Sequence, residues 1–183
     1  MTYYGGKELA ASFRQVRGNT VQIAEDIPEA NYSFKAASEC LSIGEMLVHI
    51  AFGPRVQRHI QTDRISDITK VNFPELIRKI DAEESKPRTK AEIVALLKAE
   101  GDSFASYLES LPDAFLAERV MMRPGTEPAT KTRFEMLLSP KEHEMHHRGQ
   151  LMLLQRMIGL VPHLTRQRQQ RMAQMSPAAQ PPR

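Results

Sequence analysis

Residues 132–159 read TRFEMLLSPKEHEMHHRGQLMLLQRMIG and predict the longest helix of the chain. Thr132 and Glu135 form a capping box at its start, in which each side chain satisfies a backbone N–H group of the first turn. Apolar side chains follow at spacings of three and four from Phe134 onward, so one face of this helix should be buried. Gly159 ends the pattern, as glycine commonly does at a helix C-terminus.

The same stretch contains a second capping box, formed by Ser139 and Glu142, with Pro140 at the first helical position. A helix that began there would leave the preceding apolar residues outside the helical pattern. We therefore favour the start at Thr132 and expect a kink at Pro140.

Three further amphipathic helices are predicted from apolar spacing and from the capping residues at their starts. They cover residues 7–27, 42–63 and 89–111. Gly53-Pro54 should kink or split the second of them, because proline removes a backbone hydrogen bond. A short extra helix beginning at Pro74 lies between the second and third. Residues 112–131 are expected to form a long loop with an extended piece around residues 119–123.

Four long helices without convincing strand alternation or a glycine-rich phosphate loop predict an all-α four-helix bundle. The chain has 183 residues, which suits one domain, and we assign residues 1–162 to that bundle. Residues 163–183 are rich in Gln, Arg and Pro and lack a sustained apolar stripe, so we expect a basic appendage outside the core. The run from Leu151 to Leu154 is interpreted as core.

Composition excludes several classes of protein. No apolar run approaches the roughly 18 residues of a membrane helix, and Lys7 and Glu8 interrupt any signal-peptide core, so we expect a cytoplasmic protein. Cys40 is the single cysteine. It can form neither an intramolecular disulfide nor a two-cysteine metal site, and we interpret it as a small buried side chain.

The surplus of positive charge lies in the tail. The chain has 25 Lys and Arg against 22 Asp and Glu, but no acid follows His163. Four arginines do follow it: Arg166, Arg168, Arg171 and Arg183. The body is therefore close to neutral, and with 6% aromatic residues it offers little for phosphate contacts or base stacking. We expect no nucleic-acid partner.

The histidines indicate a metal site. His143 and His147 are four residues apart, so they lie on one helix face with Cβ atoms about 5–6 Å from each other. His146 points about 100° away from His147, so a third ligand must come from another helix. His49 lies on the flank of the buried stripe of the second helix and is the inward candidate. Together these three predict a neutral-imidazole, zinc-type site.

His59 and His163 are interpreted as solvated surface residues. The string from His143 to His147 also matches H-E-x-x-H, the zinc metalloprotease motif in which Glu is the general base. We disfavour a protease because no Asp or Glu follows Glu144, and because the longer form of the motif fails at Gln150.

Two segments carry a resemblance to a known family. They are SIGEMLVH at residues 42–49 and HEMHHRGQL at residues 143–151. In these segments and in the order of its helices, over roughly residues 5–160, the chain resembles the DinB-like (YfiT-like) family of metalloproteins. The resemblance implies an up-down-down-up four-helix bundle, a homodimer, and a divalent metal held by His49, His143 and His147. The chain departs from the usual pattern at Pro140, at Gly53-Pro54 and in its basic tail.

The resemblance also implies the thiol-dependent transferase or isomerase activity of some relatives, and we expect a metal- and thiol-dependent transferase that uses a low-molecular-weight thiol on a small-molecule substrate. The expected metal is zinc or nickel, because imidazole suits both. Two alternatives stay open. One is a metal-dependent hydrolase in which Glu144 or His146 is the base. The other is a non-catalytic metal-binding protein of a stress response. Fold alone does not choose between them.

Overall fold

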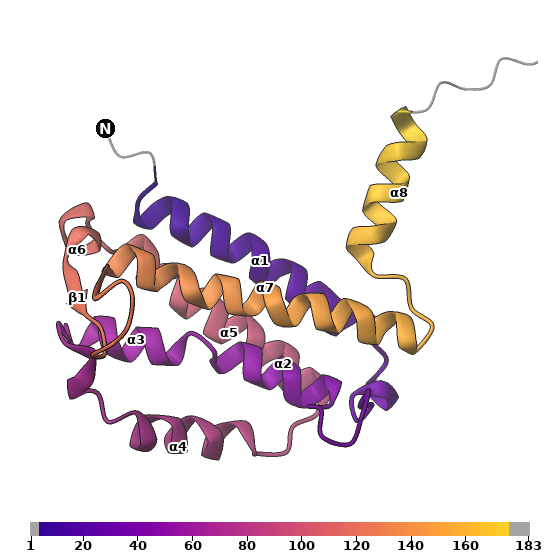
Figure 1. Cartoon of the computed structure of the whole chain (residues 1–183). Helices are drawn as coiled ribbons and strands as arrows, with labels where there is room; N and C mark the ends of the chain where they lie inside the picture. Colours follow the sequence, from indigo (N-terminus) through magenta and orange to yellow (C-terminus); the bar gives the residue numbers. More distant parts are fainter. Residues whose placement is uncertain (1–3, 176–183) are drawn as a thin grey trace, which may run out of the picture.

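The four-helix bundle is present, and its topology is up-down-down-up. The structure is a computed structural model that describes residues 4–175. The four bundle positions are filled by α1 (Gly6–Asp26), α2 (Ile43–Phe52) with its continuation α3 (Arg55–Thr62), α5 (Lys90–Glu109) and α7 (Arg133–Met157). Helices α1 and α7 run in one direction and α2, α3 and α5 in the other (Figure 1).

The second and third bundle positions, α2 with α3 and then α5, run in the same direction, so the chain must return along the bundle between them (Figure 1). Helix α4 (Phe73–Glu84) provides this return connection, and runs along the outside of the bundle from the end of α3 back toward the start of α5 (Figure 1). Helices α1 and α2 each pack against both α5 and α7, which places α2 beside α7 as expected for the histidine site.

The predicted helix boundaries are confirmed where capping residues mark them. Ser42, Thr89 and Thr132 each accept a hydrogen bond from the backbone N–H three residues later, and each has the reciprocal Glu bond of a capping box. Helix α7 thus begins at the earlier of its two predicted starts and contains Pro140. The second predicted helix is split at Gly53-Pro54, between α2 and α3.

The core is made by the inner faces of α1, α2, α5 and α7. Ile23, Leu47, Leu97 and Leu151, one from each of these four helices, are among its buried side chains. Burying such a side chain stabilises the fold by about 1.5–3 kcal/mol. The core therefore fixes which faces of α2 and α7 meet.

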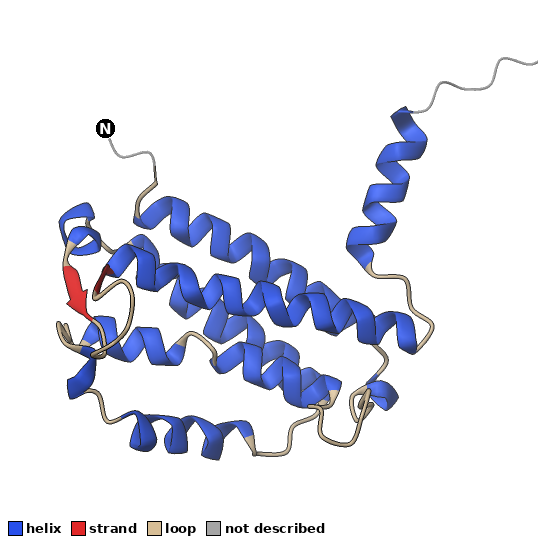
Figure 2. Ribbon diagram, in the orientation of Figure 1, coloured by secondary structure: helices blue, strands red, loops and turns tan. Residues whose placement is uncertain are grey.

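The end of the bundle opposite the α7 C-terminus differs from the prediction. The expected loop over residues 112–131 contains a short helix, α6 (Asp113–Ala117), and the first strand of an antiparallel hairpin, β1 (Arg119–Met121) with β2 (Thr130–Thr132) (Figure 2). The extended piece expected near residue 119 is β1. Strands of three residues are too short to show alternation, which is why the sequence did not predict a hairpin. Two short 3-10 helices, η1 (Glu29–Asn31) and η2 (Ile68–Lys70), lie in the connections before α2 and before α4.

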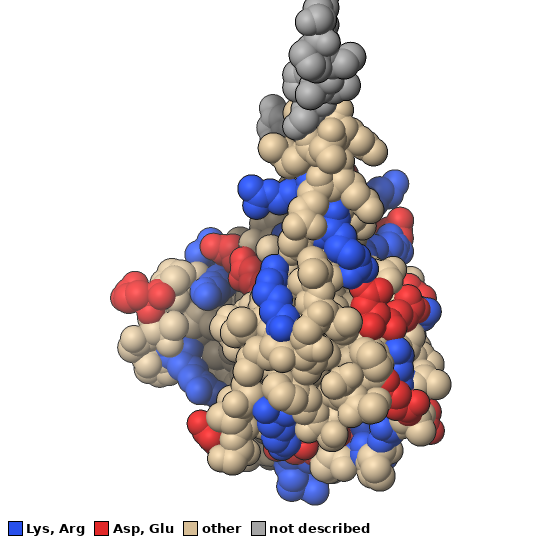
Figure 3. Space-filling model, turned by 90° about the vertical axis from the view of Figure 1, so that its right-hand side faces the viewer, with Lys and Arg blue, Asp and Glu red and all other residues tan. Residues whose placement is uncertain are grey.

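The predicted tail is helical over its described part. Helix α8 (His163–Met175) leaves the bundle after Pro162 and projects from it (Figure 1). It carries Arg166, Arg168 and Arg171, and Figure 3 shows basic side chains where this projection meets the body. His163, interpreted as a surface residue, is instead buried, and its Nε2 lies 3.2 Å from Asn19 Oδ1. The interpretation was wrong because the turn at Pro162 brings His163 back against α1. Arg183 and the last part of the tail lie outside the described residues.

Two further interpretations are corrected. Cys40 is exposed, because it lies in the irregular connector before α2 and not in a packed helix. Leu153 is exposed as well, because it occupies the outer face of α7 while Leu151 and Leu154 face the core. Among the described helices, none combines the length and apolarity needed to cross a membrane.

Candidate metal centre

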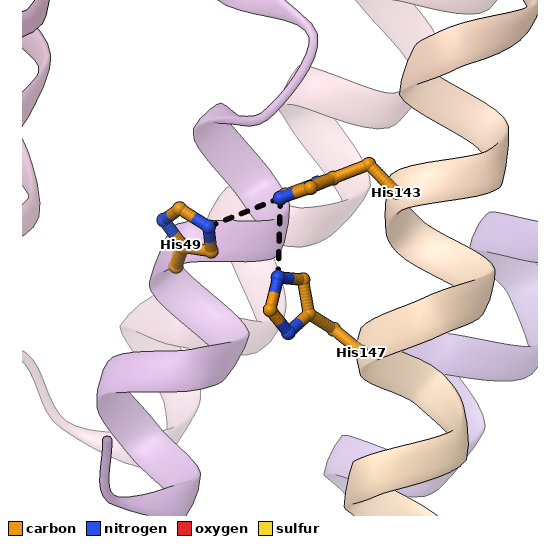
Figure 4. A group of neighbouring side chains, drawn as sticks. All are labelled: His49, His143 and His147. Carbon is orange, nitrogen blue, oxygen red and sulfur yellow. Dashed lines mark hydrogen bonds between the residues drawn. The ribbon is translucent and has the colours of Figure 1, made fainter. Parts of the chain in front are cut away.

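Three histidine side chains from two helices converge between α2 and α7. His49 comes from α2, and His143 and His147 come from successive turns of α7 (Figure 4). His143 Nε2 lies 3.1 Å from His49 Nε2 and 3.1 Å from His147 Nε2. All three can offer a nitrogen within 4.8 Å of the other two, and all three are half-buried. The sequence-based grouping of these residues is therefore reproduced in space.

The hydrogen bonds on the far side of two rings set their tautomers. His49 Nδ1 lies 3.1 Å from Glu84 Oε1 of α4, and a carboxylate can only accept, so Nδ1 carries the proton. His147 Nδ1 donates in the same way to Gln150 Oε1 at 2.7 Å. Both rings therefore present the lone pair of Nε2 to the centre of the cluster, which is the form that binds a metal.

The spacing of the nitrogens fits a divalent ion. Zn–N bonds of about 2.0–2.1 Å in a tetrahedral site place ligand nitrogens about 3.3 Å apart. The two spacings of 3.1 Å at His143 Nε2 are close to that value. If His143 Nε2 carries a proton, it can donate a hydrogen bond to only one of the two neighbouring nitrogens, His49 Nε2 or His147 Nε2. A single ion, in contrast, can bind the lone pairs of all three rings. The donor set therefore suits an ion such as zinc or nickel, for which imidazole is a good ligand.

The environment keeps two of the rings neutral. Burial, together with the neighbouring imidazoles of His147 and His49, lowers the pKa of His143 to about 4. Burial also lowers the pKa of His147. The hydrogen bond that His49 donates to Glu84 instead raises the pKa of His49. Neutral imidazoles at His143 and His147 are ready to bind a cation at neutral pH.

The break between α2 and α3 makes room for the site. A Cβ atom built at Gly53 would lie 2.9 Å from His143 Nδ1 and 3.3 Å from its Cε1. Any larger residue at this position would therefore push the His143 ring out of its place. The close approach explains why glycine stands where the helix axis changes.

The two candidate bases occupy different surroundings. Glu144 is buried on the adjacent face of α7, about 100° around the helix from His143, where both carboxylate oxygens accept from Arg17 Nε at 3.0 Å. His146 is exposed, with its ring centroid 5.1 Å from that of His147, and it accepts from Gln150 Nε2 at 3.3 Å. Of the two, only His146 lies at the rim of the cluster.

Sequence reasoning assigned no role to Glu84 or Gln150, although both orient ligand rings. Gln150 follows His147 by three residues, a helical spacing that could have indicated the contact. No comparable signal exists for Glu84, which is 35 residues from His49 and reaches it only because α4 folds back along the bundle.

One cavity opens on the side of the cluster that faces α4. It has a volume of about 340 Å³ and lies between α4 and the helices that carry the ligands. His49 and His143 form one wall, and Asp81 and Glu84 contribute carboxylates to another. The cluster is thus reachable from outside, as a site with an open ligand position requires.

Comparisons with known proteins agree with this architecture. The sequence profile of the DinB superfamily matches residues 12–151. Comparison with curated proteins gives no match.

Solved structures are similar over most of the chain. A DinB-like protein, YjoA from Bacillus subtilis, has a TM-score of 0.62 and 21% identity, over 83% of this chain and 92% of that one. An uncharacterized protein from Clostridium difficile 630 has a TM-score of 0.62 and 13% identity, over 85% and 98%. YfiT from Bacillus subtilis, described as a probable metal-dependent hydrolase with an unusual four-helix bundle topology, has a TM-score of 0.63 and 13% identity, over 87% and 91%. At these identities the likeness concerns the fold.

Proposed function

Since this chain belongs to the DinB superfamily, we propose that it is a divalent-metal-dependent enzyme in which His49, His143 and His147 hold the ion. The observation that carries the proposal is the convergence of three Nε2 atoms, two of them with the opposite ring nitrogen hydrogen-bonded to an oxygen. A bound ion would act there as a Lewis acid and lower the pKa of a small nucleophile.

The first candidate activity is transfer of a low-molecular-weight thiol to an electrophilic small molecule. It is supported by the position of Glu144, which Arg17 holds away from the cluster and which therefore cannot accept a proton from water beside the ligands. A thiol loses its proton more readily than water and so depends less on a general base, because its free pKa is about 8.5 while that of water is about 15.7. The chain's own part would be to orient the ligand rings through Glu84 and Gln150.

The second candidate is hydrolysis. It is supported by the description of YfiT as a probable metal-dependent hydrolase and by the place of His146 beside His147. In this version His146 accepts the proton from the attacking water, and no thiol is required.

Elemental analysis tests the ligand set. We expect about one zinc or nickel ion per chain in the purified protein and a large loss in the His147→Ala variant. His59→Ala is the matched control, because His59 lies on α3 and contacts Asp63, outside the cluster. Unchanged metal content in His147→Ala would overturn the site.

An assay on a panel of electrophiles and esters, with and without added thiols, separates the activities. Turnover that requires both metal and thiol supports the transferase, and turnover with metal alone supports the hydrolase. A fully metallated protein that is inactive in both formats favours the non-catalytic stress-response alternative.

We also propose that the protein is a homodimer in the cytoplasm, where a thiol co-substrate stays reduced. Light scattering over a range of concentrations tests the dimer. A monomer at every concentration would contradict it without affecting the metal site.

A further inference from the structure

A second cavity adjoins the histidine cluster on the side away from α4. Its volume is about 350 Å³, within the range of about 300–1,000 Å³ that is typical of small-molecule sites. It lies between the connector that precedes α2 and the second half of α7. Its lining residues are Ala36, Cys40, Leu41, Met46, His147, Gln150, Leu153 and Leu154.

The lining is apolar except at one end. Met46 and Leu154 are buried and form the floor, while Leu41 and Leu153 are 41% and 59% exposed. No charged side chain lines the cavity, and its hydrogen-bonding side chains are those of His147 and Gln150. The polar end is therefore the end at which a ligand ring of the cluster stands.

We propose that this cavity, the apolar pocket, binds an uncharged aliphatic or aromatic chain of the substrate and directs the reacting group of that substrate to His147. The inference rests on the proposed function and names the class of substrate: a small molecule with a polar reactive head and an apolar tail. The exposed side chains of Leu41 and Leu153 become buried when the tail binds, and the removal of this apolar surface from water provides the affinity for the tail.

The other cavity at the cluster does not suit the same chain. It contains the carboxylates of Asp81 and Glu84, and a bound alkyl group would displace water from these charged groups at a cost in free energy. The two cavities therefore differ in the chemistry they accept, and the apolar tail is assigned to the pocket without charges.

Binding of alkyl hydroxamates to the zinc-loaded protein provides the first test, with affinities measured by calorimetry. The hydroxamate group should bind the metal, so binding of the shortest compound tests the metal site. The alkyl tail should enter the apolar pocket, so the change of affinity with tail length tests the pocket. From acetohydroxamate through butyro- to hexanohydroxamate, affinity should rise by about three- to fourfold for each methylene buried. In Leu153→Gln this rise should become markedly weaker.

Met157→Gln is the matched control, because Met157 is 50% exposed on the same helix and lies outside the pocket lining. It should keep the full dependence on chain length. Equal affinities for all chain lengths in the unmodified protein, or equal losses in the two variants, would overturn the proposal.

Cys40 provides a second test that needs no metal. It is the single cysteine, it is exposed, and it lines the pocket, so thiol reagents report on this place alone. In metal-free protein, N-hexylmaleimide should react several-fold faster than N-ethylmaleimide, relative to their rates with free cysteine. Leu153→Gln should reduce that preference and Met157→Gln should not.

The two tests separate the two proposals. If acetohydroxamate does not bind but the maleimide preference is present, the proposed metal function fails and the apolar pocket stands. If acetohydroxamate binds but neither longer tails nor longer maleimides are preferred, the metal function stands and the pocket is refuted.

Discussion

Arg17 of α1 and Glu144 of α7 form an ion pair inside the bundle, with Arg17 Nη2 2.9 Å from Glu144 Oε2 and side chains only 5% and 1% exposed. Arg17 also donates to the backbone carbonyls of Leu97 and Ile50. One guanidinium thus links α1 to the three other bundle positions. It fixes the buried face of α7 that adjoins the histidines, while His143 and His147 themselves point toward α2 (Figure 4).

Glu144→Gln should destabilise the protein strongly. The substitution leaves the buried guanidinium of Arg17 without an opposite charge, and breaking a buried pair by removing one partner costs about 3–5 kcal/mol. The free energy of unfolding, measured by denaturant titration, should fall by an amount in that range. Metal content of the folded fraction should change little, because Glu144 does not touch the cluster.

The exposed pair between Arg14 and Glu109 gives a matched control. Glu109→Gln removes the same kind of charge on the surface, where an ion pair contributes about 0–1 kcal/mol. A Glu144→Gln variant with full stability and abolished metal-dependent turnover would contradict the structural role and restore Glu144 as a base.

Gly53→Ala should impair metal binding without unfolding the bundle. The added Cβ would lie 2.9 Å from His143 Nδ1, so the ring must leave the position in which its Nε2 meets the other two ligands. We expect a loss of about tenfold or more in zinc affinity, the size seen when the support of a ligand is disturbed. Competition with a zinc-binding dye measures it. Gly149→Ala, on the helix that carries His143 and in open space, should keep full affinity.

Glu84→Gln should weaken metal binding through His49. The carboxylate accepts the Nδ1 proton of His49 and so fixes the tautomer and makes the ring a better ligand. Loss of such a partner typically reduces affinity by about 10–100-fold. Glu83→Gln is the control on the same helix, because the Glu83 carboxylate binds Lys86. Equal zinc affinities in the two variants would show that Glu84 does not support the site.

The helices and the histidine grouping could be predicted because their signals are local. Capping boxes such as Ser42 with Glu45 mark helix starts within four residues, and the spacing of His143 and His147 places both on one face. The partners of these residues were not predictable in this way. Glu84 meets His49, and Arg17 meets Glu144, only through packing of helices distant in sequence.

The predictions of which side chains are buried and which are exposed failed at three residues for a related reason. Whether a residue such as His163 or Cys40 is buried depends on where the chain turns back on itself, and residue type alone does not fix that. In a run of hydrophobic residues, the sequence also does not show which side chain lies on the outer face of the helix, as Leu153 does.

The metal-free protein should lose stability as pH falls from about 6.5 toward 4. Burial and the neighbouring imidazoles lower the pKa of His143 to about 4, whereas the unfolded chain binds the proton near 6.5. The unfolded state therefore holds more protons in this window, and the free energy of unfolding decreases with acid. The raised pKa of His49 acts in the opposite direction, since its protonated form is stabilised by Glu84.

His143→Gln isolates this contribution. Denaturant titrations of the metal-free variant at several pH values should show a shallower decline between pH 6.5 and 4 than in the unmodified protein. His59→Gln, outside the cluster, should keep the original decline. An unchanged slope in His143→Gln would show that another group governs the acid response.

Deletion of residues 165–183 should leave the bundle and its metal site intact. Among the described residues, the deletion removes the ion pair between Arg166 and Asp26 and the hydrogen bond from Arg156 to Thr165. Contacts of this exposed kind contribute up to about 1 kcal/mol, so the melting temperature should fall by no more than about 2–4 °C. A longer deletion that begins at His163 also removes a buried ring packed on α1, and should cost more. Equal losses in the two truncations would show that the outer part of α8 packs on the body, and that the tail is part of the folded domain.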